Sequence, residues 1–197
     1  MRGKWAQGIE PRHFTWVIKD KVAVCERPGG YGVNHRKVRR QEEIIWLRQN
    51  EFDFVMSLCG SSQNLHNYEE MGLPFRHVPF SGPAAGPLSL TRAMASIRDH
   101  VQAGDKIIIH REMLGERITG LVAAYLVWME LVPDGPQAIS ITERLFEREL
   151  GQVARELVAM VERCEPSSAV PVDAFVAVPE DEIDPGVDDD EEGEASG

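Results

Sequence analysis

The sequence predicts an α/β fold of three layers, α/β/α, with a central, mostly parallel sheet and a disordered acidic C-terminal tail. First, short apolar runs alternate with longer segments of helical periodicity, which favours a parallel sheet with helices on both faces. Second, 43% of the 197 residues are apolar, which is enough for one core. Third, the excess negative charge is gathered at one end of the chain.

The expected elements follow in order along the chain. Lys19-Asp20-Lys21 is a polar turn between two short apolar runs, which indicates a hairpin. Apolar side chains at 41–50 lie near one helical face, and Ser89 and Gly104 are typical of a helix start and stop. We therefore expect strands at 14–18, 22–24, 52–58, 73–80 and 106–110, and helices at 41–50, 90–102, 119–131 and twice more after 137.

The net charge of −11 belongs to the end of the chain. Eleven of the 32 acidic residues and none of the 21 Lys and Arg residues lie after residue 165, which leaves 32 − 11 = 21 acids against 21 bases before it. The same segment holds four prolines and few large apolar side chains, too little apolar surface to offset its chain entropy. We expect a folded domain over 1–165 and a disordered acidic tail over 166–197.

The cysteine spacing and the apolar content argue against a disulfide-rich, metal-binding, secreted or membrane-spanning protein. Cys25, Cys59 and Cys164 have no paired or metal-binding spacing, so no disulfide framework, metal site or cofactor is predicted. Cys59 closes the strand expected at 52–58, and we expect a buried thiol there. No apolar run follows a basic start at the N-terminus, and no apolar stretch is long enough to span a bilayer. We therefore expect no secretory signal and a soluble, cytoplasmic protein.

The stretch KIIIHREMLGERITG, residues 106–120, is where the sequence predicts a ligand site. An apolar strand enters a short loop with a glycine, and the loop enters an apolar helix. Ligands of parallel α/β sheets bind beyond the carboxyl ends of the strands. The start of the helix also suits an anion, because its first backbone N–H groups lack helical partners. Glu112 and Glu116, however, place carboxylates where that anion would sit.

This strand, loop and helix resemble the motif His-Cys-x-x-Gly-x-x-Arg-Thr-Gly of cysteine-dependent protein tyrosine and dual-specificity phosphatases. Other stretches resemble small atypical members of the family in the same order, and the resemblance covers about residues 11–160. These stretches are PRHFTWVIKDKVAVCERPGG, FDFVMSL and HVPFSGPAAGPLS. The resemblance implies a phosphatase-like fold. It also implies a chemistry in which a thiolate attacks phosphorus, an Arg holds the oxygens and an Asp protonates the leaving group.

The residues that carry this chemistry are missing from the chain. Alignment on Gly115 and the Thr-Gly pair at 119–120 puts the family's cysteine on Glu112 and its arginine on Ile118. The segment aligned with the acid loop has Phe80 where the family has its aspartate.

A shift of one residue gives a second alignment, in which His110 matches the family's His, Arg111 its Cys and Arg117 its Arg. This alignment keeps a guanidinium but needs one extra residue before Thr119. Neither alignment places a cysteine in the loop.

The resemblance and these departures together predict a pseudophosphatase, a catalytically inactive phosphatase-like protein that acts as a binding or regulatory module. We expect its partner to be a protein, with a phosphorylated or anionic group as the ligand, and nucleic acid is not expected. The degenerate phosphate loop consists of Arg111, Glu112, Met113, Leu114, Gly115, Glu116, Arg117 and Ile118.

Three alternatives stay open. The chain could be a phosphatase-like hydrolase that uses the Glu112 carboxylate as its nucleophile. It could instead be an interaction protein that works through the basic run at 35–41 and the acidic tail, or the loop could be a plain connection. A related hypothesis concerns the carboxylates themselves: Glu112 or Glu116 fills the ring of N–H donors at the helix N-terminus in place of an anion.

Overall fold

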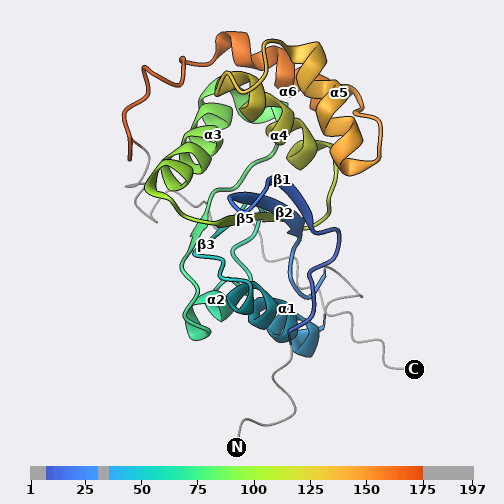
Figure 1. Ribbon diagram of the computed structural model, residues 1–197, viewed down its shortest axis with the longest axis vertical. Coiled ribbons are helices and arrows are strands. Elements are labelled where there is room, and N and C mark those ends of the chain that lie inside the picture. The colour runs from blue at the N-terminus through green and yellow to red at the C-terminus, as the bar shows by residue number, and fades with distance from the viewer. Residues whose placement is uncertain (1–7, 31–35, 175–197) are drawn as a thin grey trace, which may run out of the picture.

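The computed structural model describes residues 8–30 and 36–174, which form a five-stranded sheet and the helices around it (Figure 1). The strands are β1 (Thr15–Ile18), β2 (Val22–Glu26), β3 (Phe54–Ser57), β4 (Phe75–His77) and β5 (Ile107–Arg111), in the spatial order β1-β2-β5-β3-β4. Only β1 and β2 pair in antiparallel fashion, and the other three pairings are parallel. The predicted mostly parallel sheet is confirmed.

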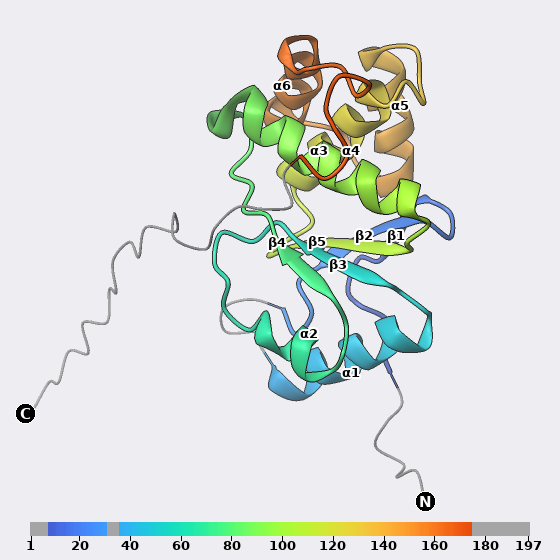
Figure 2. The same cartoon turned by 90° about the vertical axis from the view of Figure 1, so that its left-hand side faces the viewer.

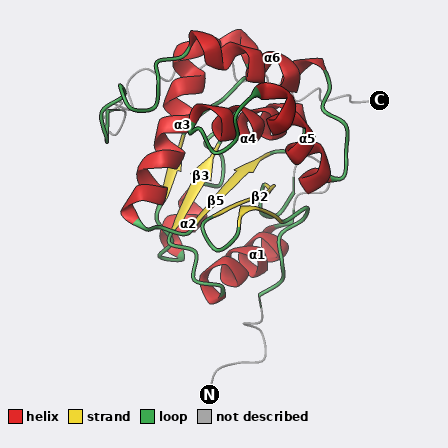
Figure 3. Cartoon of the chain, turned by 45° about the horizontal axis from the view of Figure 1, so that its top comes forward, coloured by secondary structure: helices red, strands yellow, loops and turns green. Residues whose placement is uncertain are grey.

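Helices cover both faces of the sheet, so the three-layer prediction is also confirmed (Figure 2). One face carries α1 (Lys37–Gln49) and α2 (His66–Glu70). The other carries α3 (Gly86–Ala103) and α4 (Glu116–Trp128), and α5 (Gly135–Phe146) and α6 (Gln152–Met160) pack on α4 (Figure 3). Short 3-10 turns, η2 (Pro83–Ala85) and η3 (Val161–Arg163), precede α3 and follow α6.

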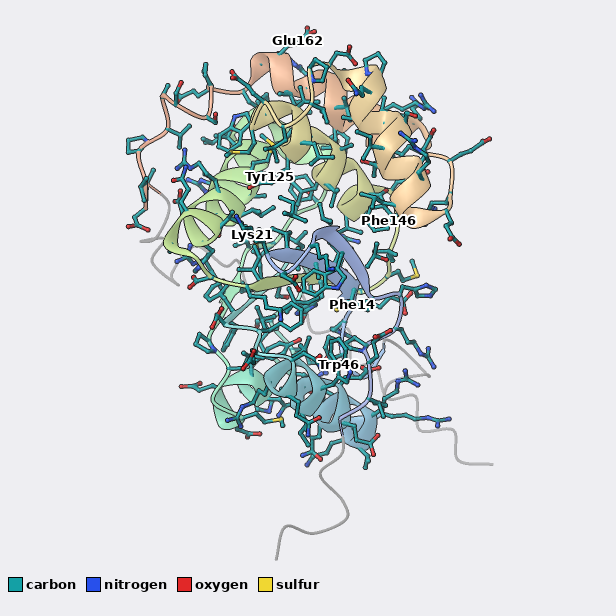
Figure 4. The ribbon with its side chains drawn as sticks, in the orientation of Figure 1. Phe14, Lys21, Trp46, Tyr125, Phe146 and Glu162 are labelled. Carbon is teal, nitrogen blue, oxygen red and sulfur yellow. The ribbon has the colours of Figure 1, made fainter. Side chains whose placement is uncertain are left out.

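The central strand β5 divides the core in two, because successive side chains of a strand point to opposite faces. Ile107 and Ile109 join the cluster under α3 and α4, which also contains Tyr125. Ile108 joins the cluster under α1, against which Phe14 and Trp46 pack from its edge (Figure 4). Each fully buried isoleucine contributes roughly 1.5–3 kcal/mol of transfer free energy. The end of β5, where the ligand site was predicted, is therefore fixed from both sides.

The ends of several elements differ from the sequence prediction. Helix α1 begins at Lys37 rather than residue 41, so most of the basic run forms its first turn; His35 lies outside the described residues. Helix α3 begins at Gly86 instead of residue 90, and α2 was not predicted at all. Helix α2 is only five residues long and mostly polar, and it is held by the buried ring of Tyr68.

The packed chain also continues past the predicted domain end at residue 165. We call residues 165–173 the C-terminal strap. The side chain of Arg98 donates to the carbonyl oxygens of Ser167, Val170 and Pro171 at 2.7, 2.8 and 3.1 Å, and Val170 is buried in the core. Contacts with the domain thus extend past residue 165 as far as the backbone N–H of Asp173, which donates to Asp99 at 2.9 Å. The domain boundary and the disordered tail stay predictions, and residues 175–197 lie outside the described residues. No helix among the described residues is long and apolar enough to cross a membrane.

Candidate functional site

Strand β5 and helix α4 present the predicted loop at the carboxyl end of the sheet. Arg111 is the last residue of β5, and its carbonyl oxygen accepts a hydrogen bond from the backbone N–H of Arg27 at 2.7 Å. Gly115 precedes the first turn of α4, where Glu116 is the first helical residue. All eight predicted loop residues therefore lie between the last strand position and the first turn of the helix. Their roles as ligand-binding residues stay a prediction.

The Glu112 carboxylate crosses to the segment that follows β3. Its Oε1 accepts a hydrogen bond from the backbone N–H of Gly60 at 2.9 Å, and its Oε2 lies 3.5 Å from Nη1 of Arg111. The side chain is 29% exposed, and Oε2 itself is buried without a hydrogen-bond partner among the described residues. Glu112 is thus held between an N–H group and a guanidinium, as a bound anion would be.

The Glu116 carboxylate reaches a different helix from its own. Its Oε2 accepts hydrogen bonds from the backbone N–H groups of Val153 and Ala154 at 2.9 and 3.4 Å, in the first turn of α6. A carboxylate is stabilised there by the unpaired N–H groups and the helix dipole. A carboxylate does fill the start of a helix, as hypothesised, but the helix is α6 rather than α4. The reason is that α4 and α6 pack closely at Gly120, where an added Cβ would lie 2.6 Å from Cα of Ala154.

Two further arginines contribute to this surface, Arg117 from the loop itself and Arg148 from outside it. The stem of Arg117 lies against Gly82, where an added Cβ would be 3.2 Å from Cγ of the arginine. Arg148 donates from Nη1 to the carbonyl oxygen of Leu114 at 2.7 Å. Met113, at the tip of the loop, is 48% exposed. The loop surface therefore combines guanidinium groups with one exposed apolar side chain.

Two of the aligned positions are buried in the core. Ile118, in the first turn of α4, is fully buried, and Phe80 is 1% exposed in the same core cluster. Neither side chain can bind an oxyanion or donate a proton to a leaving group.

A buried polar network lies directly behind the loop, and sequence reasoning did not find it. The ring of His110 lies with Nδ1 3.6 Å from Sγ of Cys59 and Nε2 3.0 Å from the hydroxyl of Tyr68. His77 Nε2 lies 2.8 Å from the carbonyl oxygen of Cys59. These four residues fix the Cys59–Gly60 peptide, whose N–H group holds Glu112. Tyr68 comes from the unpredicted helix α2, so the spacing of the histidines carried no signal of this network.

Burial decides the protonation states in this network. Burial lowers the pKa of His110 to about 3, with smaller contributions from the charges of Arg27 and His77. Burial also raises the pKa of Cys59 to about 11, and the Glu112 carboxylate adds to the rise. The imidazole is neutral and the thiol protonated at neutral pH. The prediction that Cys59 is a buried thiol is confirmed, and it is not a thiolate nucleophile.

Comparison with solved structures finds the same fold in known phosphatases. Kinase-associated phosphatase, with its catalytic cysteine replaced by serine, gives a TM-score of 0.64 at 17% identity over 78% of this chain and 96% of its own. Tk-PTP in its active form gives 0.61 at 18% identity over 77% and 97%. The core catalytic domain of the PP-IP phosphatase SIW14 from S. cerevisiae gives 0.58 at 16% identity over 79% and 88%.

These structures define the class of fold. The chain has the α/β/α fold of the dual-specificity and protein tyrosine phosphatases, which confirms the resemblance at the level of the fold. No protein-family model matches the sequence, and no curated protein matches it. The similar structures belong to phosphatases, so the fold alone does not separate an active enzyme from an inactive one.

Proposed function

We propose that this protein is a phosphatase-like binding module that does not hydrolyse phosphate esters. The observation that carries the proposal is the absence of a thiol from residues 111–118, whichever alignment is used. Arg111 or Glu112 stands at the nucleophile position, and a guanidinium cannot replace a thiolate there. Cys59, which follows β3 and lies beside His110, is buried and protonated. The segment aligned with the acid loop offers only the buried ring of Phe80 as its acid.

The loop surface suggests the partner. Arg111 and Arg117 supply guanidinium groups that suit an oxyanion, and the exposed Met113 supplies an apolar contact at the tip. These features suit a protein partner that presents an acidic or phosphorylated group next to an apolar residue. The spacing does not separate the two alignments, because five residues lie between Arg111 and Arg117 and five between Glu112 and Ile118, as between the family's Cys and Arg. The cytoplasmic location stays a prediction.

Turnover of p-nitrophenyl phosphate by the full-length protein tests the proposal. Glu112→Ala and Arg117→Ala are assayed beside the wild type, with an active dual-specificity phosphatase as the positive control. We expect all three forms of this protein to match the buffer blank. Wild-type turnover that either substitution removes would show that the loop is catalytic and would overturn the proposal.

One observation favours the carboxylate-nucleophile alternative. Oε2 of Glu112 accepts no hydrogen bond from the described residues, and the side chain must turn outward to bring this buried oxygen to a substrate. Attack on a phosphate ester would form an acyl phosphate and release the alcohol, which needs a proton that Phe80 cannot give. Turnover lost in Glu112→Gln and in Glu112→Ala alike would support this alternative.

The remaining alternative assigns function to the basic run and the acidic tail. The structure changes how this alternative is tested, because the strap bonds to Arg98 and buries Val170, so residues 166–173 must be kept. Deletion of 175–197 should leave the fold intact and remove ten of the eleven acidic side chains after residue 165. A partner whose affinity at low salt falls on this deletion would favour the tail over the loop as the working surface.

A further inference from the structure

We propose that Glu112 is a built-in anion which occupies the ligand site of its own loop, so that an anionic ligand must displace it to bind. This inference rests on the proposed function, because it concerns binding at the same loop. It adds a regulatory property: the loop is closed to weak anions by its own carboxylate, and it opens to a ligand that binds the same donors better.

The contacts of Glu112 are those of a bound oxyanion. One carboxylate oxygen takes the Gly60 N–H at 2.9 Å, and the other lies 3.5 Å from the Arg111 guanidinium. The backbone N–H of Arg27 bonds to the Arg111 carbonyl, so the chain after β2 borders the same place. A backbone N–H and a guanidinium, each at one of two oxygens, are usual donors for a phosphate or carboxylate group.

The fit of Glu112 is incomplete, which is what distinguishes it from a structural carboxylate. Glu43, a structural carboxylate, is 1% exposed and uses both oxygens: Oε2 accepts from the Gly29 N–H at 2.6 Å and Oε1 from Arg39 Nε at 2.7 Å. By contrast, Oε2 of Glu112 and Nε of Arg111 are buried with no hydrogen-bond partner among the described residues. Buried polar atoms without partners are costly. A ligand with more oxygens would therefore gain bonds that Glu112 leaves unmade.

Charge explains why the occupied loop excludes other anions. A free oxyanion and the Glu112 carboxylate would lie within a few ångströms of each other and would share the same two donors, so they repel each other. Removal of the carboxylate charge ends this repulsion and leaves the Arg111 guanidinium to the ligand, and removal of the whole side chain also frees the Gly60 N–H. An oxyanion can come from a phosphate group or from a carboxylate. The phosphate group is expected to bind more tightly, because it brings more charge and a third oxygen.

The test is the affinity of the full-length protein for inorganic phosphate, with acetate titrated in parallel, measured by isothermal titration calorimetry. Glu112→Gln is the decisive variant, because the amide keeps an oxygen for the Gly60 N–H and removes only the charge. Glu112→Ala removes both. Glu162→Gln is the matched control: it deletes one carboxylate from an exposed position in the outer helical layer, away from the sheet (Figure 4).

We expect Glu112→Gln to bind phosphate at least tenfold more tightly than the wild type, and more tightly than it binds acetate. The control should match the wild type. Adding Arg111→Gln to Glu112→Gln should remove the gain, because the guanidinium is the donor that the uncharged side chain no longer pairs with. Far-ultraviolet circular dichroism and the unfolding midpoint confirm that each variant is folded.

Two results would overturn the inference. One is a Glu112→Gln variant that binds phosphate no more tightly than the wild type does. The other is an equal gain in Glu162→Gln, which would make the effect one of net charge. Phosphatase activity of the wild type would refute the proposed function. The inference about Glu112 would still be judged by whether Glu112→Gln binds phosphate more tightly than the wild type. An inactive wild type with no gain in Glu112→Gln would refute the inference alone.

Discussion

The C-terminal strap and the β5–α4 loop are both irregular segments held by charged side chains, but the two are held very differently. Arg98 is 3% exposed, bonds to three carbonyl oxygens of the strap, pairs with Asp99 and lies 5.6 Å from the Trp128 ring centre. The loop is held by Glu112, which is partly exposed and leaves one oxygen without a hydrogen bond to the described residues. The strap is held by a buried guanidinium whose hydrogen bonds are made, whereas the loop is held by a carboxylate with a bond unmade.

This difference separates structural charge from functional charge. A buried charge that meets all its partners fixes one conformation, and removing it leaves other buried groups unpaired. A partly exposed charge with an unmade bond costs little to move and is available to a ligand. Local departures from good packing and complete bonding are expected at functional sites. We therefore expect substitutions in the strap to change stability, and substitutions in the loop to change binding.

The largest effect on stability is expected for Arg98→Met. The variant keeps an apolar stem against Trp128 but leaves three carbonyl oxygens of the strap and the Asp99 carboxylate without the guanidinium. Breaking a buried charge arrangement of this kind costs about 3–5 kcal/mol. Urea unfolding measures it, with the exposed Arg163→Met as the matched control. A loss under about 1 kcal/mol would contradict the view that Arg98 holds the strap.

A smaller effect, about 2 kcal/mol, is expected from the pH dependence that His110 gives to stability. Its pKa of about 3 in the folded protein lies below the ordinary 6.5, so the unfolded chain binds a proton that the folded protein does not. Stability is therefore lost as the pH falls from 6.5 towards 3, by about 1.4 kcal/mol per pH unit, or about 2 kcal/mol between pH 7.5 and 5.

The difference between wild type and His110→Asn isolates this contribution, because all other groups titrate in both. We expect the wild type to lose about 2 kcal/mol more than the variant between pH 7.5 and 5, measured by urea unfolding at each pH. If the free energy of unfolding fell by the same amount with pH in both proteins, His110 would not be buried in its neutral form. The network behind the loop would then not be the fixed support that the structure indicates.

The sequence predicts the scaffold of the site well and its internal contacts poorly. The apolar run before Arg111 and the apolar helix after Gly115 identify β5 and α4 because their patterns are local. The start of α1 was missed because basic residues fill its first turn, with no acidic residue there and no side-chain cap, so the usual start signals were absent. The strap was missed because its one buried anchor, Val170, stands among prolines in a segment of tail-like composition.

The partners of the two loop glutamates were beyond sequence reasoning for a different reason. Gly60 is 52 residues from Glu112, and Val153 is 37 residues from Glu116. Both partners donate backbone N–H groups, which every residue except proline carries. No side-chain type or spacing therefore marks them. The hypothesis that a carboxylate fills the start of a helix could be made from composition, but which helix depends on the packing of α4 against α6.

Glu116 provides the third prediction, of intermediate size. Its carboxylate caps the first turn of α6, and loss of such a cap costs about 1 kcal/mol, within a range of about 0.5–2. We expect Glu116→Ala to lose about this amount in urea unfolding and Glu116→Gln to lose less, because the amide oxygen still accepts from Val153 and Ala154. Equal losses for the two variants would show that charge, rather than the cap bond, is what matters.

The smallest effect on stability is expected at Glu112, although its effect on binding is the largest proposed. The carboxylate is partly exposed, and its contact with Arg111 is long, so the pair contributes about 0–1 kcal/mol, as exposed ion pairs do. Glu112→Gln should therefore unfold within about 0.5 kcal/mol of the wild type, a shift smaller than that of Glu116→Ala. If the Glu112 variant were instead destabilised by as much as the Arg98 variant, Glu112 would be a structural carboxylate like Glu43. The strap and the loop would then be held in the same way, because the Glu112 side chain would be fixed too firmly for a ligand to displace it.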